Sequence, residues 1–114
     1  MQLSRITITE ETAYMFAKLQ MAYGGKSAQR TLDEVLTAAW YLITQDAVPP
    51  RLTLAHEEPT VIDTIFNFNL VGESYVQMFV EIKRRLSLGE RDKATNADAV
   101  GHVVRTVYIY YDQL

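Results

Sequence analysis

The chain contains one pattern twice: a short alternating segment that leads directly into helical segments. Residues 3–9, LSRITIT, place Ile6 and Ile8 on one side and polar side chains on the other, which predicts a half-buried strand. Residues 63–70, DTIFNFNL, alternate in the same way. One such unit cannot fold alone, because a lone strand leaves its backbone groups unpaired and two short helices bury too little apolar surface. We therefore expect the two strands to pair as an antiparallel ribbon over a core shared by four helices.

Capping and stop signals delimit the predicted helices of the first half. Thr9 can cap a helix that ends at the two glycines 24–25, because glycine readily adopts the left-handed conformation that closes a helix. Ser27 can cap a second helix, in which apolar residues recur at helical spacing as far as about Gln45. The first half is therefore predicted to be a strand followed by two helices.

The second half follows the same order. A helix is predicted over about residues 72–88 and, after the polar loop GERDKAT, another over about 95–111. When the segment EVLTAAWYLITQ (34–45) is aligned with HVVRTVYIYYDQ (102–113), the apolar positions coincide. This match in the last helix of each half indicates a tandem strand–helix–helix repeat.

A linker is predicted between the two units. Residues 46–60 contain all three prolines of the chain and separate a first unit, 1–45, from a second unit, 61–114. A linker of about 15 residues can span roughly 50 Å, which is enough to return the chain across a small core. Within it RLTL (51–54) alternates and could form a short extra strand. We predict one compact domain over 1–114, with an α+β fold that is mostly α-helical.

Composition limits the classes of function. The chain has 114 residues, no cysteine, 11 basic and 14 acidic residues and a net charge of −3. Without cysteine there is no disulfide, cysteine-ligated zinc or thiol nucleophile. No apolar run approaches the length of a membrane span, so we expect a soluble, cytoplasmic protein with no membrane partner. The acidic balance disfavours indiscriminate nucleic-acid binding, but it is compatible with a local basic patch.

Catalytic and metal-binding patterns are weak in this sequence. Neighbouring carboxylates occur at 10–11, 33–34 and 57–58, but adjacent side chains on a helix diverge and make poor acid–base pairs. His56 has no companions at the spacing of a metal site. The chain also has no phosphate-binding glycine loop. We predict a protein that is not an enzyme and has no cofactor, metal or small-molecule substrate.

The first half resembles the ribbon–helix–helix DNA-binding family. The resemblance is carried by RITIT, by EETAYMFAKLQMAY and by Gly25-Lys26-Ser27 at the start of a second helix. It covers residues 3–45 well and 62–113 less closely, because the loop GERDKAT has no Gly-x-Ser turn. Members of that family are usually dimers whose shared ribbon enters the DNA major groove. The resemblance implies a single-chain tandem form, in which two units make a pseudo-dimer.

The resemblance also implies which strand residues would read bases. Arginine can bind guanine with a fork of two hydrogen bonds, asparagine suits adenine, and threonine can contact either a polar edge or a thymine methyl group. Alternatively, these residues are only the solvated outer face of a strand, and Asp63 and Ile65 weaken the case because they share the outer phase. The predicted base-reading residues are Arg5, Thr7, Thr9, Asn67 and Asn69.

Phosphate contacts are expected at the start of the second helix of each unit. A helix N-terminus presents free N–H groups and the positive end of the helix dipole to an anion. The alternative is ordinary capping with solvated charges around it. The predicted phosphate-binding residues are Lys26, Ser27 and Arg30 in the first unit and Arg91, Lys93, Thr95 and Asn96 in the second.

Together these features lead to one functional hypothesis and one alternative. The resemblance implies sequence-specific binding of double-stranded DNA by a small transcriptional regulator, such as a repressor, or by a DNA-organising accessory protein of a phage, plasmid or other mobile element. Self-association or a protein partner is compatible with so small a footprint. The alternative is a protein–protein interaction module, either an inhibitor or a structural protein, that keeps the fold without binding DNA. The excess of acidic residues favours that alternative.

Overall fold

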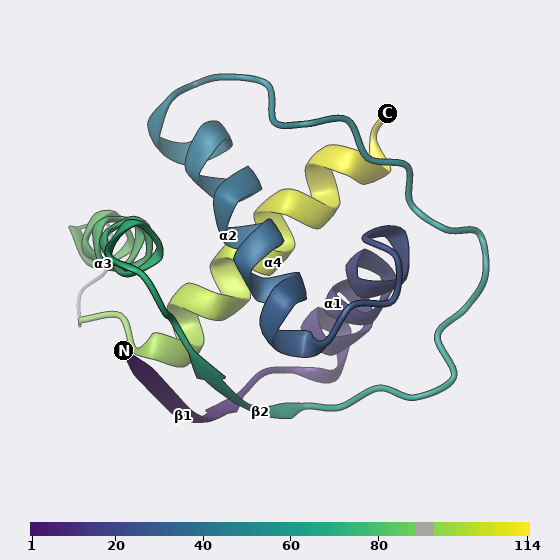
Figure 1. The fold of residues 1–114 in the computed structure, drawn as a ribbon, viewed down its shortest axis with the longest axis horizontal. Coiled ribbons are helices and arrows are strands. Elements are labelled where there is room, and N and C mark those ends of the chain that lie inside the picture. Colours follow the sequence, from purple (N-terminus) through teal and green to yellow (C-terminus); the bar gives the residue numbers. More distant parts are fainter. Residues whose placement is uncertain (89–92) are drawn as a thin grey trace.

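A computed structural model of the chain describes residues 1–88 and 93–114. Within them the fold is α+β and mostly helical, with four helices and one two-stranded antiparallel sheet, as predicted (Figure 1). The sheet lies along one edge of the molecule, and α4 crosses the centre of the molecule (Figure 1). The elements are, in order, β1 (Gln2–Thr7), α1 (Glu10–Ala22), α2 (Ala28–Thr44), β2 (Ile65–Asn69), α3 (Glu73–Leu88) and α4 (Asn96–Asp112).

The predicted pairing of the two strands is confirmed. β1 runs antiparallel to β2, with Leu3 opposite Phe68 and Ile6 opposite Phe66. Leu3, Ile6 and Phe68 are buried and Phe66 is half-buried, so the apolar side of the ribbon closes the core. Backbone hydrogen bonds continue past both ends of the ladder, from Ile8 to Thr64 at 2.9 Å and from Leu70 to Met1 at 2.8 Å.

The capping residues expected from the sequence are in place. The Thr9 hydroxyl accepts a hydrogen bond from the Thr12 N–H at 3.1 Å, and the Ser27 hydroxyl accepts one from the Arg30 N–H at 3.2 Å. α1 ends before two glycines with positive φ angles, 91° and 70° at residues 24 and 25. Residues that carry a side chain rarely adopt this left-handed backbone conformation, so the glycine pair both ends α1 and turns the chain towards α2.

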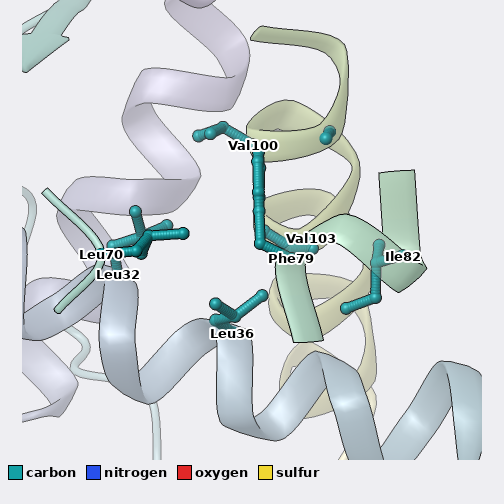
Figure 2. Close-up of a pocket in the computed structure, with 8 residues that line it drawn as sticks. Leu32, Leu36, Leu70, Phe79, Ile82, Val100 and Val103 are labelled. Carbon is teal, nitrogen blue, oxygen red and sulfur yellow. The ribbon is translucent and has the colours of Figure 1, made fainter. Parts of the chain in front are cut away.

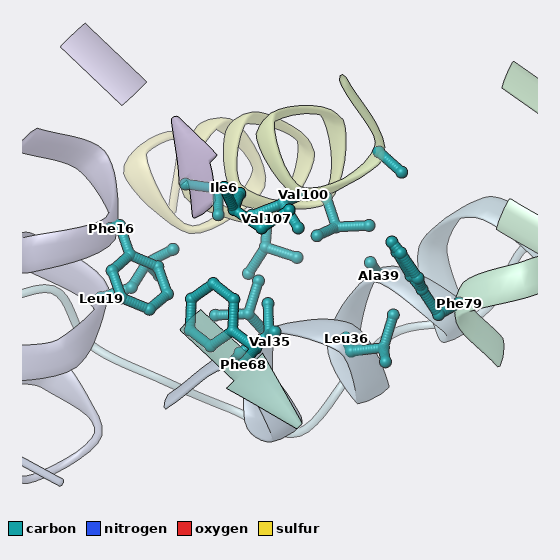
Figure 3. Packing of buried hydrophobic residues seen from close by; sticks show 14 of the residues in the cluster. Ile6, Phe16, Leu19, Val35, Leu36, Ala39, Phe68, Phe79, Val100 and Val107 are labelled. Atoms are coloured by element: carbon teal, nitrogen blue, oxygen red, sulfur yellow. The ribbon is translucent and has the colours of Figure 1, made fainter. Parts of the chain in front are cut away.

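Each half contributes one helix that packs chiefly against the other half. α1 packs mainly against α4, α3 packs mainly against α2, and α2 and α4 contact each other in the centre. Phe16 of α1 meets Phe68 and Phe66 of the ribbon edge to face, with ring centroids 6.1 and 5.2 Å apart. Figure 3 shows Phe16 and Phe68 in one cluster with Val35 of α2 and Val107 of α4. The core is therefore shared by all six elements.

The core is tightly filled where α2, α3 and α4 meet. A gap of about 10 Å³ remains there, and its lining is entirely apolar, so it offers a water molecule no hydrogen-bond partner. In Figure 2 the side chains of Phe79 and Ile82 from α3 lie near Leu36 of α2 and Val103 of α4. None of the helices in residues 1–88 and 93–114 has both the length and the apolar character that crossing a membrane requires.

The long connection between α2 and β2 runs around the outside of α1 and past the end of α4 (Figure 1). The short extra strand considered for residues 51–54 is absent from the structure. Leu52 and Leu54 pack against the core. Next to this stretch a backbone carbonyl accepts its hydrogen bond from a side chain rather than from a neighbouring strand: the Tyr111 hydroxyl donates to the Pro50 carbonyl.

Candidate nucleic-acid interface

The outer face of the ribbon is polar. Four of the five predicted base-reading residues, Arg5, Thr7, Asn67 and Asn69, lie exposed on the paired strands, on the side opposite the core. The fifth, Thr9, follows β1 as the N-cap of α1, and its hydroxyl also donates to the Thr12 hydroxyl at 2.9 Å. Ile65 begins β2 and is 62 % exposed, so the face includes one apolar side chain. Sequence reasoning did not select Gln2 and Ser4, which are also exposed on β1.

A β-bulge interrupts β1 in the middle of this face. Ser4 and Arg5 together stand opposite the single residue Asn67, because Leu3 pairs with Phe68 and Ile6 with Phe66. Arg5 has a φ angle of 52°, in the left-handed region. In a regular strand Leu3 and Ile6 would point to opposite faces. The extra residue brings both into the core, where they are 0 % and 3 % exposed, and leaves Ser4 and Arg5 outside.

Two hydrogen bonds connect Asn67 and Asn69 of β2 to their surroundings. The Arg5 backbone N–H donates to Oδ1 of Asn67 at 2.9 Å. The Asn69 backbone N–H donates to Oε1 of Gln29 at 2.7 Å, which connects the end of β2 to the first turn of α2. The side chain of Asn67 is therefore partly engaged inside the ribbon.

Helix N-termini flank both ends of the ribbon. The start of α2 lies beside the end formed by Gln2 and Asn69, through the Gln29 hydrogen bond. The start of α4 lies beside the other end, where Thr7, Thr9 and Asp98 line a shallow groove of about 110 Å³. A ligand that covered the ribbon would therefore meet a helix N-terminus on each side.

The N-terminus of α2 is suited to an anion. Ser27 caps the helix, and the first turn contains no acidic residue. Arg30 is exposed in this turn. Just before the helix, Lys26 forms an ion pair of 3.0 Å with Glu34, in which both side chains are 40 % or more exposed. An exposed pair of this kind contributes little free energy, so the Lys26 ammonium can exchange Glu34 for a phosphate at small cost.

The N-terminus of α4 differs. Thr95 and Asp98 form a capping box, in which the Asp98 carboxylate accepts the Thr95 N–H at 2.9 Å. This hydrogen bond lowers the pKa of Asp98, so the carboxylate stays charged at the helix end. Asn96 accepts a hydrogen bond from the Lys83 ammonium at 2.9 Å. Lys93 is exposed, and Arg91 lies outside the described residues. The predicted phosphate site of the second unit is therefore occupied largely by its own cap.

Carboxylates stand around the ribbon but not on its face. Near the Thr7 end, Asp98 is joined by Glu10 and Glu11 in the first turn of α1. Asp63 is exposed just before β2, and Glu73 begins α3 beyond the other end. The paired strands themselves carry Arg5 and no acidic residue. Among the cations, Arg5 lies on the face itself, Lys26 and Arg30 lie at the α2 end, and Arg105 lines the groove at the Thr7 end together with Asp98.

Other candidate sites are less developed. In the part of the chain that the structure describes, no three acidic or histidine side chains gather as they would around a metal ion. His56 is exposed in the linker, whereas His102 is half-buried, and burial lowers its pKa.

No family model, curated protein or solved structure matches this chain. The ribbon with the two adjoining helix ends is thus the strongest candidate site.

Proposed function

We propose that this protein binds double-stranded DNA sequence-specifically by placing the β1–β2 ribbon in the major groove. The observation that carries the proposal is a two-stranded antiparallel ribbon whose outer face has no carboxylate and whose ends adjoin two helix N-termini. The major groove is about 12 Å wide and admits a ribbon of this size. The N-terminus of α2 suits a phosphate that borders the groove, whereas the N-terminus of α4 already holds the Asp98 carboxylate.

We further propose that the two halves form a pseudo-dimer of the ribbon–helix–helix type. The packing supports this, because α1 lies on α4 as α3 lies on α2. Burial supports it too: the aligned pairs Val35 with Val103 and Ala39 with Val107 are all buried. A pseudo-twofold axis would pass between the strands, relating α2 to α4.

The face offers chemistry for several bases. Arg5 can donate two hydrogen bonds to guanine, Asn69 can pair with adenine, and Ile65 can contact a thymine methyl group. Because β1 and β2 carry different side chains, the recognised site would be asymmetric rather than palindromic. The phosphate contacts would also be unequal, with Lys26, Ser27 and Arg30 acting at the α2 end and the Asp98 carboxylate opposing them at the α4 end.

The biological role that fits this chemistry is a small transcriptional regulator, such as a repressor, or a DNA-organising accessory protein of a mobile element. Selection of bound duplexes from a random pool at low and moderate salt tests the proposal. We expect an enriched sequence that binds roughly 1,000-fold or more tightly than random DNA, with an affinity that falls as salt rises. Absence of any retained duplex at about 50 mM salt would contradict it.

The second candidate function is a protein-interaction module that keeps the fold without binding DNA. The carboxylates at the Thr7 end favour it, as does the net charge of −3. The same selection separates the two functions, because an interaction module would retain no duplex even at low salt.

A further inference from the structure

The bulge in β1 presents two adjacent side chains where a regular strand presents one. Ser4 and Arg5 are both exposed between the buried residues Leu3 and Ile6. This inference rests on the proposed DNA binding. We propose that Ser4 and Arg5 contact the DNA together and that Asn67 is a positioning residue that holds Arg5 in place. In this assignment Asn67 does not itself read adenine.

The geometry gives Asn67 this role. A bulge removes one backbone N–H from the regular ladder, and an unpaired N–H is unfavourable wherever water is excluded, as it would be under bound DNA. Here the Arg5 N–H finds its acceptor in Oδ1 of Asn67 at 2.9 Å. That bond holds Arg5 in a left-handed conformation that residues other than glycine adopt with strain. The Asn67 side chain thus fixes the direction in which Arg5 leaves the strand.

The same bond limits what Asn67 can read. Asparagine recognises adenine by donating from its amide nitrogen and accepting with its amide oxygen at the same time. The oxygen of Asn67 already accepts the Arg5 N–H, which leaves it one lone pair and holds the amide towards β1 rather than towards a base. By contrast, no ion pair in the described chain occupies the Arg5 guanidinium. We therefore expect Arg5 to select a guanine and the Ser4 hydroxyl to contact an adjacent base or its sugar–phosphate.

Asn67→Ala, Asn67→Asp and Asn69→Ala, compared with the wild-type protein and with Arg5→Ala, separate positioning from reading. The measurement is competition binding against duplexes with one base pair changed at a time. We expect Asn67→Ala to lose about tenfold of the preference at the same guanine that Arg5→Ala affects. Asn67→Asp keeps an acceptor for the Arg5 N–H, so it should retain this preference while its added charge weakens all binding. Asn69→Ala, the matched control, should affect a different base pair.

Two outcomes distinguish failure of this inference from failure of the proposed function. If Asn67→Ala relaxes an A·T position and leaves the guanine preference intact, Asn67 is a reader and the positioning role is overturned. If the wild-type protein retains no duplex at about 50 mM salt, the proposed function falls and this inference falls with it.

A second measurement needs no DNA. Amide hydrogen exchange should show the Arg5 N–H protected in the wild-type protein and in Asn67→Asp, and about tenfold less protected in Asn67→Ala. An Arg5 amide that exchanges freely in the wild-type protein would overturn the proposed positioning.

Discussion

The Lys18 ammonium of α1 donates a hydrogen bond of 3.0 Å to the main-chain carbonyl of Glu57 in the linker. It also donates to the carbonyl of Ala55, and the lysine is only 6 % exposed. Within the described residues no carboxylate lies at ion-pair distance from it. A buried charge is tolerated only when its hydrogen-bonding capacity is met. The linker is therefore a fixed part of the domain, because it satisfies a cation that α1 buries.

Lys18→Met tests this role. Methionine retains an unbranched side chain but cannot hold the two linker carbonyls, so we expect the free energy of unfolding to fall by about 1–3 kcal/mol in urea denaturation. The control is Lys26→Met, which removes an exposed ammonium and should change that free energy by no more than about 0.5 kcal/mol. Equal effects of the two substitutions would contradict a structural role for Lys18.

Separated halves test the shared core. Because α1 packs chiefly on α4 and α3 on α2, each half leaves its main apolar face uncovered without the other. We expect peptides 1–60, which keeps the linker, and 61–114 to show no cooperative thermal transition as monomers, and an equimolar mixture to gain helical circular dichroism with such a transition. A peptide 61–114 that melts cooperatively as a monomer would contradict the single-domain description.

Most of the fold could be predicted from local rules. The alternation of apolar and polar residues predicts both strands, and the capping residues Thr9, Ser27 and Thr95 predict three helix starts. Because a lone strand leaves backbone groups unpaired, the two strands are also predicted to pair with each other. A regular alternation over residues 3–9 does not predict the bulge. Leu3, three residues before Ile6, is out of phase with it, and that mismatch was the available signal. The ties between α1 and the linker could not be foreseen, because they join side chains to carbonyl groups more than 35 residues away.

The sequence predicts the strand residues of the candidate site better than the residues at the helix ends. Strand period alone identifies which residues face outward, so four of the five predicted base readers lie together on the ribbon. Thr9 fits both the outward phase of the strand and the cap of the next helix, and in the structure the cap determines its place. At the second helix of the other half, the spacing of Thr95 and Asp98 already had the form of a capping box. A capping box at this position indicates that the Asp98 carboxylate occupies the expected phosphate site.

Asp98→Asn should strengthen DNA binding under the proposed function. The substitution removes a negative charge from the helix end beside the ribbon, so we expect an affinity increase of about two- to fivefold at low salt that shrinks as salt rises. The matched control is Asp112→Asn, which makes the same charge change at the far end of α4 and should have a smaller effect. Equal gains from the two variants would point to net charge rather than to the α4 end.

The same residue makes stability depend on pH. The folded-state pKa of Asp98 is lowered by hydrogen bonds from Thr95, so its contribution to stability is present above the unfolded-state pKa of about 3.9. It is lost as the pH falls through the lower folded-state value. We expect Asp98→Asn to melt at a lower temperature than the wild-type protein at pH 6, and the difference to shrink towards pH 2. A difference in melting temperature that is unchanged between these pH values would exclude a role for the Asp98 charge.

Arg5→Ala and Arg30→Gln should weaken DNA binding in different ways if the ribbon lies in the major groove. Arg5 stands on the paired strands, so its loss should abolish the preference at one base pair, worth about 1–3 kcal/mol, and leave most salt-dependent binding in place. Arg30 stands in the first turn of α2, so its loss should weaken binding to selected and random duplexes alike and reduce the salt slope by about 1. Arg84→Gln is the matched control, because Arg84 pairs with Glu81 on the exposed face of α3. If Arg5→Ala reduces binding to selected and random DNA by the same factor, Arg5 contacts the backbone and the ribbon does not read sequence through it.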